Sequence, residues 1–547
     1  MASVEALLAR EVGQLGRYQV RVLLLCGAAS ILSAFSTNEF VFTTGRIDTR
    51  CLIPECENPD EAVFAPSWIL NAVPSEGDGF TSCERFNSSA AAAAGTCPAA
   101  LFDSTTIVEC EQYVYENTNT AVYTLELGCD EWRRSLLGSA RTAGALVALP
   151  VAGALADRWG RRTALALVAF NTAWIGLLRY FAATYIGFII SVFFESALGA
   201  GGILACGYIL ILEVVPAKYR VIAGTMSNSC FAMGQIILGL LAWAVPNWRH
   251  LTLVLYTPQL LAITYFWIMP ESIRWYLSKG KYEEAEAALK NIAQINGRKV
   301  SAKTLQELRE AAEETERITA IKLKENDSEP WLLMKVFRHK AILLRCLVAP
   351  VWWITMTLVY YGLSINAVNI SGNQYHNYMV VAAVEIPGFW SAMLLVERVG
   401  RKPVLMMAYW VCAAGQIAYI FMPADQYEAS LAVYLVSKYG ISMVVTAMYL
   451  YTSELFPTQH RQTLFAFCSM MGRVGAIVAP LTPALGMSVW EQLPSALFAG
   501  MALVAGLLTL LTPETRGCRL PDTMEEAARI GKTRPNRPNV AKIVSRL

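Results

Sequence analysis

The chain repeats one charged motif at two places that are 240 residues apart. The first copy is Asp157-Arg158-Trp159-Gly160-Arg161-Arg162, and the second is Glu397-Arg398-Val399-Gly400-Arg401-Lys402. Two further motifs return in the same order, with offsets of 241 and 243 residues: Glu213-x-x-Pro216-x-x-x-Arg220 with Glu454-x-x-Pro457-x-x-x-Arg461, and Pro270-Glu271-Ser272 with Pro513-Glu514-Thr515. Because each landmark lies between long apolar runs, the repeats predict two homologous membrane bundles, an architecture typical of transporters.

The composition also indicates a membrane protein. Of the 547 residues, 55% are hydrophobic and 16% are charged, and the mean hydropathy is +0.39, which is too apolar for a soluble protein of this length. A helix needs about 20 apolar residues to cross a bilayer. Twelve segments meet this condition: 19–42, 138–156, 163–182, 184–212, 221–245, 250–269, 341–363, 377–396, 403–422, 428–452, 461–485 and 492–512. We therefore expect an all-α membrane protein with twelve transmembrane helices in two pseudo-symmetric six-helix bundles.

The distribution of charge predicts the orientation in the membrane. The segment 51–129 carries twelve acidic residues and a single basic one, Arg85, whereas 271–340 carries fourteen lysines and arginines. Basic loops stay in the cytoplasm. We therefore expect a multi-pass protein of the plasma membrane, with 51–129 outside, 271–340 inside and both termini in the cytoplasm.

On this scheme the chain divides into five parts. They are a cytoplasmic N-terminal segment (1–18), an N-terminal six-helix bundle (19–270) that includes an extracellular Cys-rich loop at 43–137, a cytoplasmic helical linker (271–340), a C-terminal six-helix bundle (341–512) and a cytoplasmic tail (513–547). In the linker, apolar residues recur every three to four positions over 282–295 and 304–318, which predicts amphipathic helices. The first 18 residues predict a short amphipathic helix rather than a cleaved signal peptide.

The acidic loop has features of an oxidising compartment. It holds six of the thirteen cysteines, namely Cys51, Cys56, Cys83, Cys97, Cys110 and Cys129. An even set in an extracellular segment predicts three disulfides and leaves their pairing open. The sequon Asn87-Ser88-Ser89 in the same loop predicts glycosylation of Asn87. A second sequon at Asn369 lies close to the membrane, and a third at Asn326 falls on the cytoplasmic side.

The repeated motifs carry charges that suit a latch at the cytoplasmic face. The glycines allow a tight turn at the end of a span, and the acids and arginines can pair with charges on neighbouring spans. Such pairs would hold one conformational state and break in the other. We expect a gating role for Asp157, Arg158, Arg161, Glu213, Arg220, Glu397, Arg398, Arg401, Glu454 and Arg461. The simpler interpretation is that the basic residues only anchor short cytoplasmic loops.

Residues 10–530 resemble one known family. The features that carry the resemblance are the Cys-rich first loop, Pro270-Glu271-Ser272-Ile273-Arg274-Trp275-Tyr276-Leu277, Tyr451-Thr452-Ser453-Glu454-Leu455-Phe456-Pro457 and Pro513-Glu514-Thr515-Arg516-Gly517. On these features the chain resembles the major facilitator superfamily and, within it, solute carrier family 22, the organic cation, anion and carnitine transporters. The resemblance implies a twelve-helix uniporter, exchanger or cotransporter of small organic ions.

Ionisable residues inside spans are candidates for the substrate site, because inserting each one costs about 2.5–3.5 kcal/mol. Four of them stand out: Glu195, Glu385, Lys438 and Arg473. In the family that the chain resembles, cation-selective members typically have an acid at the position of Arg473, whereas anion and carnitine transporters have arginine, and Lys438 is also similar to the latter group. A buried guanidinium attracts a carboxylate and repels a cation.

One acid near two bases suits a zwitterionic substrate. Arg473 and Lys438 would bind a carboxylate, and Glu385 would bind an ammonium group beside the cation–π faces of three aromatic residues, Trp353, Tyr360 and Tyr361. In the alternative interpretation, Glu385 pairs with Lys438 or Arg473 and the set is structural. The Arg-x-x-Gln-Gly signature common in span 4 of the superfamily is replaced by residues 192–196 here, so the coupling ion, sodium or proton, stays open.

The sequence therefore predicts an alternating-access transporter of a carnitine-like zwitterion or an organic anion. An organic cation transporter is the alternative, and a ligand sensor that does not transport is an alternative of another class. An enzyme is disfavoured, because the chain has four scattered histidines and neither an H-E-x-x-H nor a G-x-S-x-G motif. We expect no cofactor, no bound metal and no nucleic-acid partner, and a monomeric transport unit in the lipid bilayer.

Overall fold

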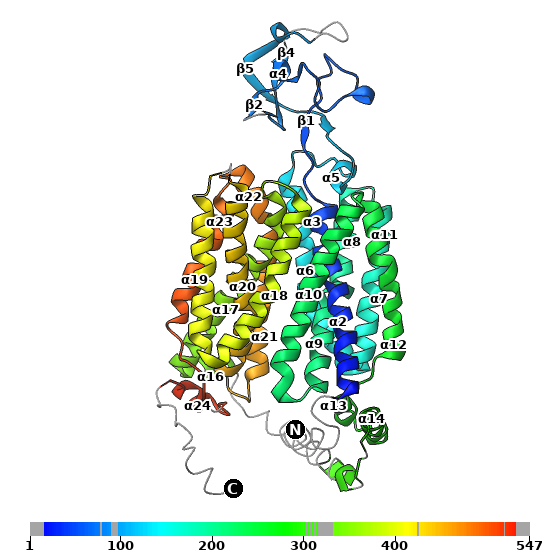
Figure 1. Ribbon diagram of the computed structural model, residues 1–547, viewed down its shortest axis with the longest axis vertical. Helices are drawn as coiled ribbons and strands as arrows, with labels where there is room; N and C mark the ends of the chain where they lie inside the picture. Colours follow the sequence, from blue (N-terminus) through cyan, green and yellow to red (C-terminus); the bar gives the residue numbers. More distant parts are fainter. Residues whose placement is uncertain are drawn as a thin grey trace.

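The computed structural model describes residues 16–76, 79–88, 97–298, 300–301, 303–306, 309–310, 313, 332–423, 426–518 and 520–531. A small domain occupies one end of the longest axis, long helices form the middle, and short helices lie at the opposite end (Figure 1). We call these two ends of the helical layer the domain end and the linker end. Most of the helix expected at 1–18, much of the one at 304–318 and the tail beyond 531 lie outside the described residues.

The first six spans form one group of helices, coloured blue to green in Figure 1. Their apolar runs are interrupted by a π-helical segment in the middle of the fourth span and by a 3-10 segment near the linker end of the sixth. The elements are α2 (Arg17–Asn38) and α3 (Phe40–Thr43); α6 (Glu131–Trp159); α7 (Arg161–Leu178) and η3 (Arg179–Phe181); α8 (Tyr185–Glu195), the π-helix η4 (Ser196–Ala200) and α9 (Gly201–Val214); η5 (Ala217–Tyr219) and α10 (Arg220–Ala244); and α11 (Trp248–Gln259), η6 (Leu260–Thr264) and α12 (Tyr265–Ile268).

The last six spans form the second group, coloured yellow-green to orange. The elements are α17 (Lys340–Asn366) and η8 (Ala367–Asn369); α18 (Gln374–Arg398); α19 (Arg401–Ile420); α20 (Tyr427–Leu455); α21 (Arg461–Val478), η9 (Ala479–Leu481) and α22 (Thr482–Ser488); and α23 (Leu493–Thr509). Among the described residues, eleven spans are long and apolar enough to cross a bilayer, and α23 is apolar but has 17 residues. The predicted fold of twelve helices in two bundles is confirmed.

The glycine of each repeated motif separates two helices, as the sequence predicts. Gly160 has φ of 99° and Gly400 has φ of 126°, in the left-handed region where side chains are strained. As a result α6 ends just before Gly160 and α7 begins with Arg161, and α19 begins with Arg401 directly after Gly400. The two arginines therefore occupy equivalent places in the two bundles.

The acidic loop folds into a small domain with β-structure that the sequence analysis does not anticipate. Its three two-stranded antiparallel sheets pair β1 (Thr49–Cys51) with β6 (Tyr113–Tyr115), β2 (Ser75–Glu76) with β3 (Gly79–Phe80), and β4 (Glu84–Ser88) with β5 (Phe102–Glu109). The connections hold η1 (Pro59–Glu61), α4 (Ile69–Ala72) and η2 (Ala99–Leu101), and α5 (Ala121–Thr124) leads back to the helices. We call residues 48–129 the disulfide domain.

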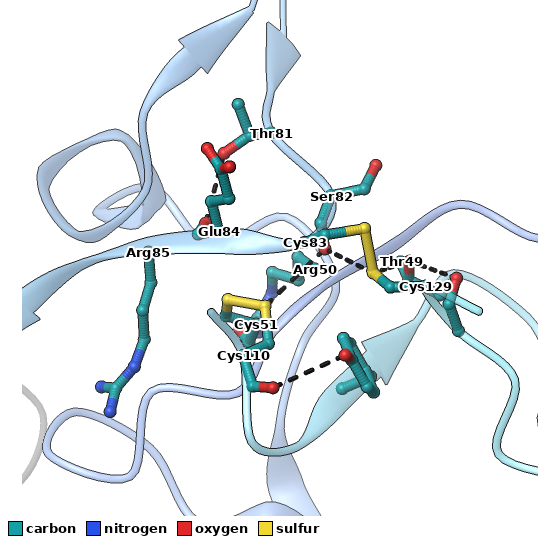
Figure 2. Close-up of a disulfide and its surroundings, with 12 residues drawn as sticks. Thr49, Arg50, Cys51, Thr81, Ser82, Cys83, Glu84, Arg85, Cys110 and Cys129 are labelled. Atoms are coloured by element: carbon teal, nitrogen blue, oxygen red, sulfur yellow. Dashed lines mark hydrogen bonds between the residues drawn. A yellow bond between two sulfur atoms is a disulfide. The ribbon is translucent and has the colours of Figure 1, made fainter. Parts of the chain in front are cut away.

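Three disulfides hold this domain together. They join Cys51 to Cys110, Cys56 to Cys97 and Cys83 to Cys129. The first and third bridges lie close together around β1 (Figure 2). Beside them, the fully buried Arg50 makes a double hydrogen bond to Glu57, and its Nε atom donates to the Phe64 carbonyl at 2.8 Å. The small domain thus combines three disulfides and a buried ion pair with a small apolar cluster around Ile53, Ile69 and Phe102.

Short helices cover the linker end of both bundles (Figure 1). They are α13 (Ile273–Ser278), α14 (Tyr282–Ile295), α16 (Leu332–Arg338) and α24 (Met524–Arg529). The apolar face of α14 packs into the core of the N-terminal bundle, and Asn296 at its end accepts a 3.0 Å hydrogen bond from the Tyr18 backbone at the start of α2. Met524 and Ala527 of α24 belong to the core of the C-terminal bundle. These helices therefore brace the bundles individually.

The two bundles meet most closely at the domain end. Helix α10 packs along α18, and α6 packs against α21 and η9. At the domain end, the ring of Phe42 lies 5.5 Å from Tyr375 and 4.9 Å from Tyr378, and the Ser139 hydroxyl donates to the Ile477 carbonyl at 2.8 Å. Within the described ranges, α9 and α20 do not pack extensively on each other. The conformation is closed at the domain end.

Candidate functional site

A buried ion pair lies in the middle of the C-terminal bundle. Glu385 of α18 and Lys438 of α20 are both 0% exposed, and Lys438 Nζ lies 2.9 Å from Glu385 Oε1. The ammonium also donates to the Tyr360 carbonyl at 3.0 Å and the Ser364 hydroxyl at 2.7 Å, and it lies 3.9 Å from the centre of the Tyr360 ring. Both charges are therefore already neutralised by the protein itself.

Glu385 also links the two bundles. Its Oε2 accepts a hydrogen bond from the Tyr360 hydroxyl at 2.6 Å and another from the amide of Gln235 at 3.0 Å. Gln235 lies on α10 of the N-terminal bundle, so this buried bond crosses the interface. One carboxylate therefore binds Lys438 within its own bundle and Gln235 across the interface.

The second basic residue of this region, Arg473, has a different environment. It is half-buried on α21, and no carboxylate of the described residues lies within 4.0 Å of its guanidinium. Its neighbours are aromatic: it acts electrostatically on Tyr449, whose ring lies 4.8 Å from that of Trp353. Trp353 lies 5.3 Å from Phe465 and donates to the Thr452 hydroxyl at 3.3 Å. An uncompensated cation with an aromatic surround can receive an anionic group.

A larger cluster of charges is buried in the N-terminal bundle. Arg141 of α6 forms two hydrogen bonds to Glu195 at the end of α8, at 3.2 and 3.3 Å. Arg179 of η3 contacts both Glu195 and Glu39, which connects α2 to α3. The four charged side chains are at most 3% exposed, and the hydroxyl of Tyr256 donates to Glu195 at 3.0 Å. Two acids and two arginines make the cluster neutral.

Local packing explains how Glu195 reaches its partners. A Cβ added to Gly144 of α6 would lie 2.4 Å from the carbonyl oxygen of Phe193, so the glycine allows α6 and the end of α8 to touch. A Cβ added to Gly176 of α7 would lie 2.5 Å from the ring of Tyr256. The π-helical turn η4 follows Glu195 directly, and such turns are frequent at functional sites. Close packing at these glycines thus lets side chains of the second, third and sixth spans reach the Glu195 carboxylate.

The repeated motifs at the linker end form matching networks. Arg161 Nε donates to Glu213 at 3.1 Å, and Arg401 Nε donates to Glu454 at 3.1 Å. Asp157, although its side chain is 76% exposed, lies 3.1 Å from Arg161. These ion pairs join spans within one bundle, so they fix the linker end of each bundle separately.

Two further acids, absent from the predicted gating set, complete these networks. Glu271 accepts hydrogen bonds from the backbone N–H groups of Arg161 and Arg162 at the start of α7, and Glu514 accepts from those of Arg401 and Lys402 at the start of α19. A carboxylate at a helix N-terminus is stabilised by the unpaired N–H groups and the helix dipole. Burial raises the pKa of Glu271, against the effect of these N–H groups.

The other predicted gating residues lie around these networks. Arg220 Nε donates to the Leu212 carbonyl and Arg461 Nε to the Phe456 carbonyl, which repeats one more contact in both bundles. Arg158, Glu397 and Arg398 are exposed. No described basic residue forms an ion pair with Glu397, in contrast to Asp157 in the first copy of the motif.

The chain was compared with known proteins. The profile of the family described as "Sugar (and other) transporter" matches residues 95–526. An organic cation transporter protein of Drosophila melanogaster is 30% identical over 95% of this chain and 94% of its own length. An organic cation/carnitine transporter 2 of Rattus norvegicus is 28% identical over 95% of this chain and 93% of its own. The chain belongs to solute carrier family 22 of the major facilitator superfamily.

Solved structures agree on the fold. The inward-open xylose transporter of E. coli superposes with a TM-score of 0.61 at 16% identity, covering 92% of this chain and 98% of that one. Its partially occluded inward-open form gives a TM-score of 0.58 at 14% identity, covering 90% and 98%. These structures show the major facilitator fold. Because the chain belongs to solute carrier family 22, it is a multi-pass membrane transporter of small organic ions and not an enzyme.

In this solute carrier the predicted substrate residues fall into two groups. Glu385, Lys438 and Tyr360 touch one another, and Tyr361 lies 5.3 Å ring to ring from Tyr360. Arg473 and Trp353 belong to a second group, together with Tyr449 and Phe465. Sequence reasoning missed Glu39, Arg141 and Arg179, because each lies near the end of an apolar run or beside the loop charges that usually flank spans.

Proposed function

We propose that this solute carrier moves a small organic anion, or a zwitterion that presents a carboxylate, across the plasma membrane by alternating access. The observation that carries the proposal is the contrast between Arg473 and Glu385. Arg473 lacks an ionic partner among the described residues, whereas Glu385 has Lys438. The three charges sum to one net positive charge near mid-membrane, and a buried positive charge favours a carboxylate over a bare cation.

The aromatic residues supply the rest of the substrate site. Trp353, Tyr449 and Phe465 pack ring against ring, and Tyr449 interacts electrostatically with Arg473; such an aromatic surface suits the apolar body of an organic anion. The ammonium of a carnitine-like zwitterion would approach Tyr361 and Tyr360, where cation–π attraction is available. Glu385 can bind this ammonium only if Lys438 moves away from it. The simpler ligand is therefore an anion, or a zwitterion whose ammonium stays distant from Glu385.

The transport cycle follows from alternate opening of the domain end and the linker end. In the proposed orientation the disulfide domain lies outside, because 51–129 is acidic and 271–340 is basic. Substrate would enter from outside, bind Arg473 between the bundles, and favour closure of the domain end that the present conformation displays. Release to the cytoplasm follows at the linker end, where the two networks around Arg161 and Arg401 keep each bundle rigid while the bundles rock apart.

An organic cation is the second candidate substrate. It is favoured by two relatives, an organic cation transporter and an organic cation/carnitine transporter, and by the aromatic ring of Tyr360 beside Glu385. Against it stands the neutralisation of Glu385 by Lys438 at 2.9 Å. A ligand sensor that does not transport would use the same residues, and only a measurement of substrate flux across the membrane distinguishes it from a carrier.

Uptake into cells tests the proposal directly. Cells that express the chain receive labelled carnitine, aminohippurate or tetraethylammonium, each with and without sodium, and surface protein is measured in parallel. Uptake of carnitine or aminohippurate above that of untransfected cells supports the proposal, and sodium dependence identifies the coupling ion. Uptake of tetraethylammonium alone would overturn it, since Arg473 would then not face the substrate. Binding without uptake of any probe would indicate a sensor.

A further inference from the structure

The neutral cluster of Glu39, Arg141, Arg179 and Glu195 is not part of the proposed substrate site, yet it joins most of the N-terminal bundle. Its members come from the first four spans, and Tyr256 adds the sixth. Arg179 also lies over the rings of Phe188 at 5.6 Å and Tyr256 at 5.7 Å. Charges in a low-dielectric interior attract strongly and are expensive to separate. These spans therefore move as one unit.

The cluster connects directly to the closure at the domain end. Glu39 is the residue between α2 and α3, and its carbonyl accepts hydrogen bonds from the backbone of Phe42 at 3.1 Å and of Thr43 at 3.0 Å. Its carboxylate contacts Arg179 and lies 3.7 Å from Arg141. The ion pairs thus fix the residue that immediately precedes α3, the short helix that carries the contacts to the other bundle.

Helix α3 supplies the N-terminal half of that closure. Phe42 contacts Tyr375 and Tyr378 of α18 across the interface. Phe40 and Pro480 of η9 both face Gly138, where an added Cβ would lie 2.8 Å from the phenylalanine and 2.7 Å from the proline. The position of α3 decides whether these aromatic contacts form.

We infer that Glu39, Arg141, Arg179 and Glu195 are positioning residues that hold α3 in place and so keep the domain end closed between transport steps. They act through Phe40 and Phe42, and their electrical balance is the property that matters. Loss of one charge leaves an uncompensated partner in the bundle interior, which favours a rearrangement that admits water and releases α3. Removal of one charge of each sign restores the balance.

The test uses a cysteine reporter at the closure. Ser135 of α6 is 5% exposed and lines a small cavity together with Phe40, Gly138 and Pro480. In the full-length chain with Ser135→Cys, a membrane-impermeant thiol reagent applied to intact cells labels this cysteine only when the domain end opens. The chain without the reporter gives the background from its native free cysteines, such as Cys230. Permeabilised cells show whether reagent reaches the reporter from the other side.

Four changes are compared in the reporter background. We expect Glu39→Gln to raise the labelling rate by about tenfold, within the usual range of coupling between sites. The balanced double variant Glu39→Gln/Arg141→Gln should return the rate to within about twofold of the parent. Tyr256→Phe removes one hydrogen bond and should raise the rate less than Glu39→Gln does. Glu116→Gln, an exposed acid of the disulfide domain, is the matched control and should leave the rate unchanged.

Two outcomes would overturn the inference. One is a parental labelling rate in Glu39→Gln at normal surface expression; the other is a balanced double variant that labels as fast as the single one. If Glu39→Gln does not reach the surface, the rate of Tyr256→Phe decides in the same way. The inference rests on the proposed orientation and on transport by alternating access. Because the readout needs no substrate, a wrong substrate class leaves it unaffected, and a wrong orientation shows as labelling only after permeabilisation.

Discussion

The ammonium of Lys438 and the carboxylate of Glu385 form a fully buried pair, 2.9 Å apart, inside the C-terminal bundle. A pair of this kind offers little net stability compared with apolar residues of the same shape, but removal of one partner leaves an isolated buried charge. The pair also holds Gln235 of the other bundle through Glu385. The pair therefore stabilises the interface between the two bundles through the hydrogen bond that Gln235 donates to Glu385.

Lys438→Met should destabilise the folded protein by about 3–5 kcal/mol, the usual effect of breaking a buried ion pair. Thermal unfolding of the purified protein in detergent measures the effect. The double variant Lys438→Met/Glu385→Gln should recover much of the loss, because no charge is then left unpaired. If Lys438→Met melts like the parent protein, Glu385 has found another partner, and the pair is not the support described here.

Arg473→Asp should abolish uptake of organic anions and zwitterions and admit organic cations, because it reverses the charge that faces the aromatic surround. Arg473→Lys keeps the charge but loses the planar fork of the guanidinium, so it should retain part of the anion uptake with a raised KM. Both variants are compared by uptake of labelled aminohippurate and tetraethylammonium at equal surface expression. Unchanged selectivity in Arg473→Asp would remove this residue from the substrate site.

The sequence predicts the architecture well because the architecture depends on periodic, local features. The repeated motifs place Gly160 and Gly400 at turns with positive φ, and the apolar runs give the twelve spans. The six loop cysteines identify a disulfide-bonded domain. Their pairing and the short strands could not be predicted, since both depend on how β1 and β6 meet across the 61 residues between them.

The sequence predicts the site only in part. Mid-span position identifies Glu385, Lys438 and Arg473, but it cannot tell which charges neutralise one another. That distinction depends on helix rotation: Lys438 lies against Glu385, whereas Arg473 has no carboxylate of the described residues within 4.0 Å. Glu39 was missed because it follows Asn38 near the end of a span, where an acid is ordinarily a flanking charge.

Glu213→Gln should slow transport more than Asp157→Asn does, although both acids contact Arg161. Glu213 is 14% exposed and Asp157 is 76% exposed, and exposed ion pairs contribute only about 0.2–1 kcal/mol. Each change should lower the maximal rate more than it raises KM, because the network at the linker end is remote from the substrate. Initial uptake rates over a range of substrate concentrations separate the two parameters.

Glu454→Gln in the C-terminal bundle provides the matched comparison, because Glu454 contacts Arg401 as Glu213 contacts Arg161. Equivalent networks should give losses of similar size. A variant that weakens substrate affinity and leaves the maximal rate unchanged would contradict a gating role for the motif.

Arg50→Met should prevent the disulfide domain from folding. The guanidinium is fully buried and holds Glu57, the Cys51 carbonyl at 2.8 Å and the Phe64 carbonyl, so its removal leaves several acceptors without donors at a cost of about 3–5 kcal/mol. The chain should then be retained inside the cell, with little of the protein at the surface. Surface biotinylation and the mobility of the glycosylated band measure this, with Asn87→Gln identifying the band that carries the predicted glycan.

Arg85→Met is the control for this prediction. Arg85 pairs with Glu55 at 3.1 Å in the same domain, but both side chains are partly exposed, so water can replace the lost bonds and the effect should be small. Equal surface expression of the two variants would mean that the three disulfides alone determine the fold of the domain. A selective loss with Arg50→Met would instead show that folding needs the buried ion pair as well as the disulfides, because the small apolar cluster of the domain would not hold its loops together without it.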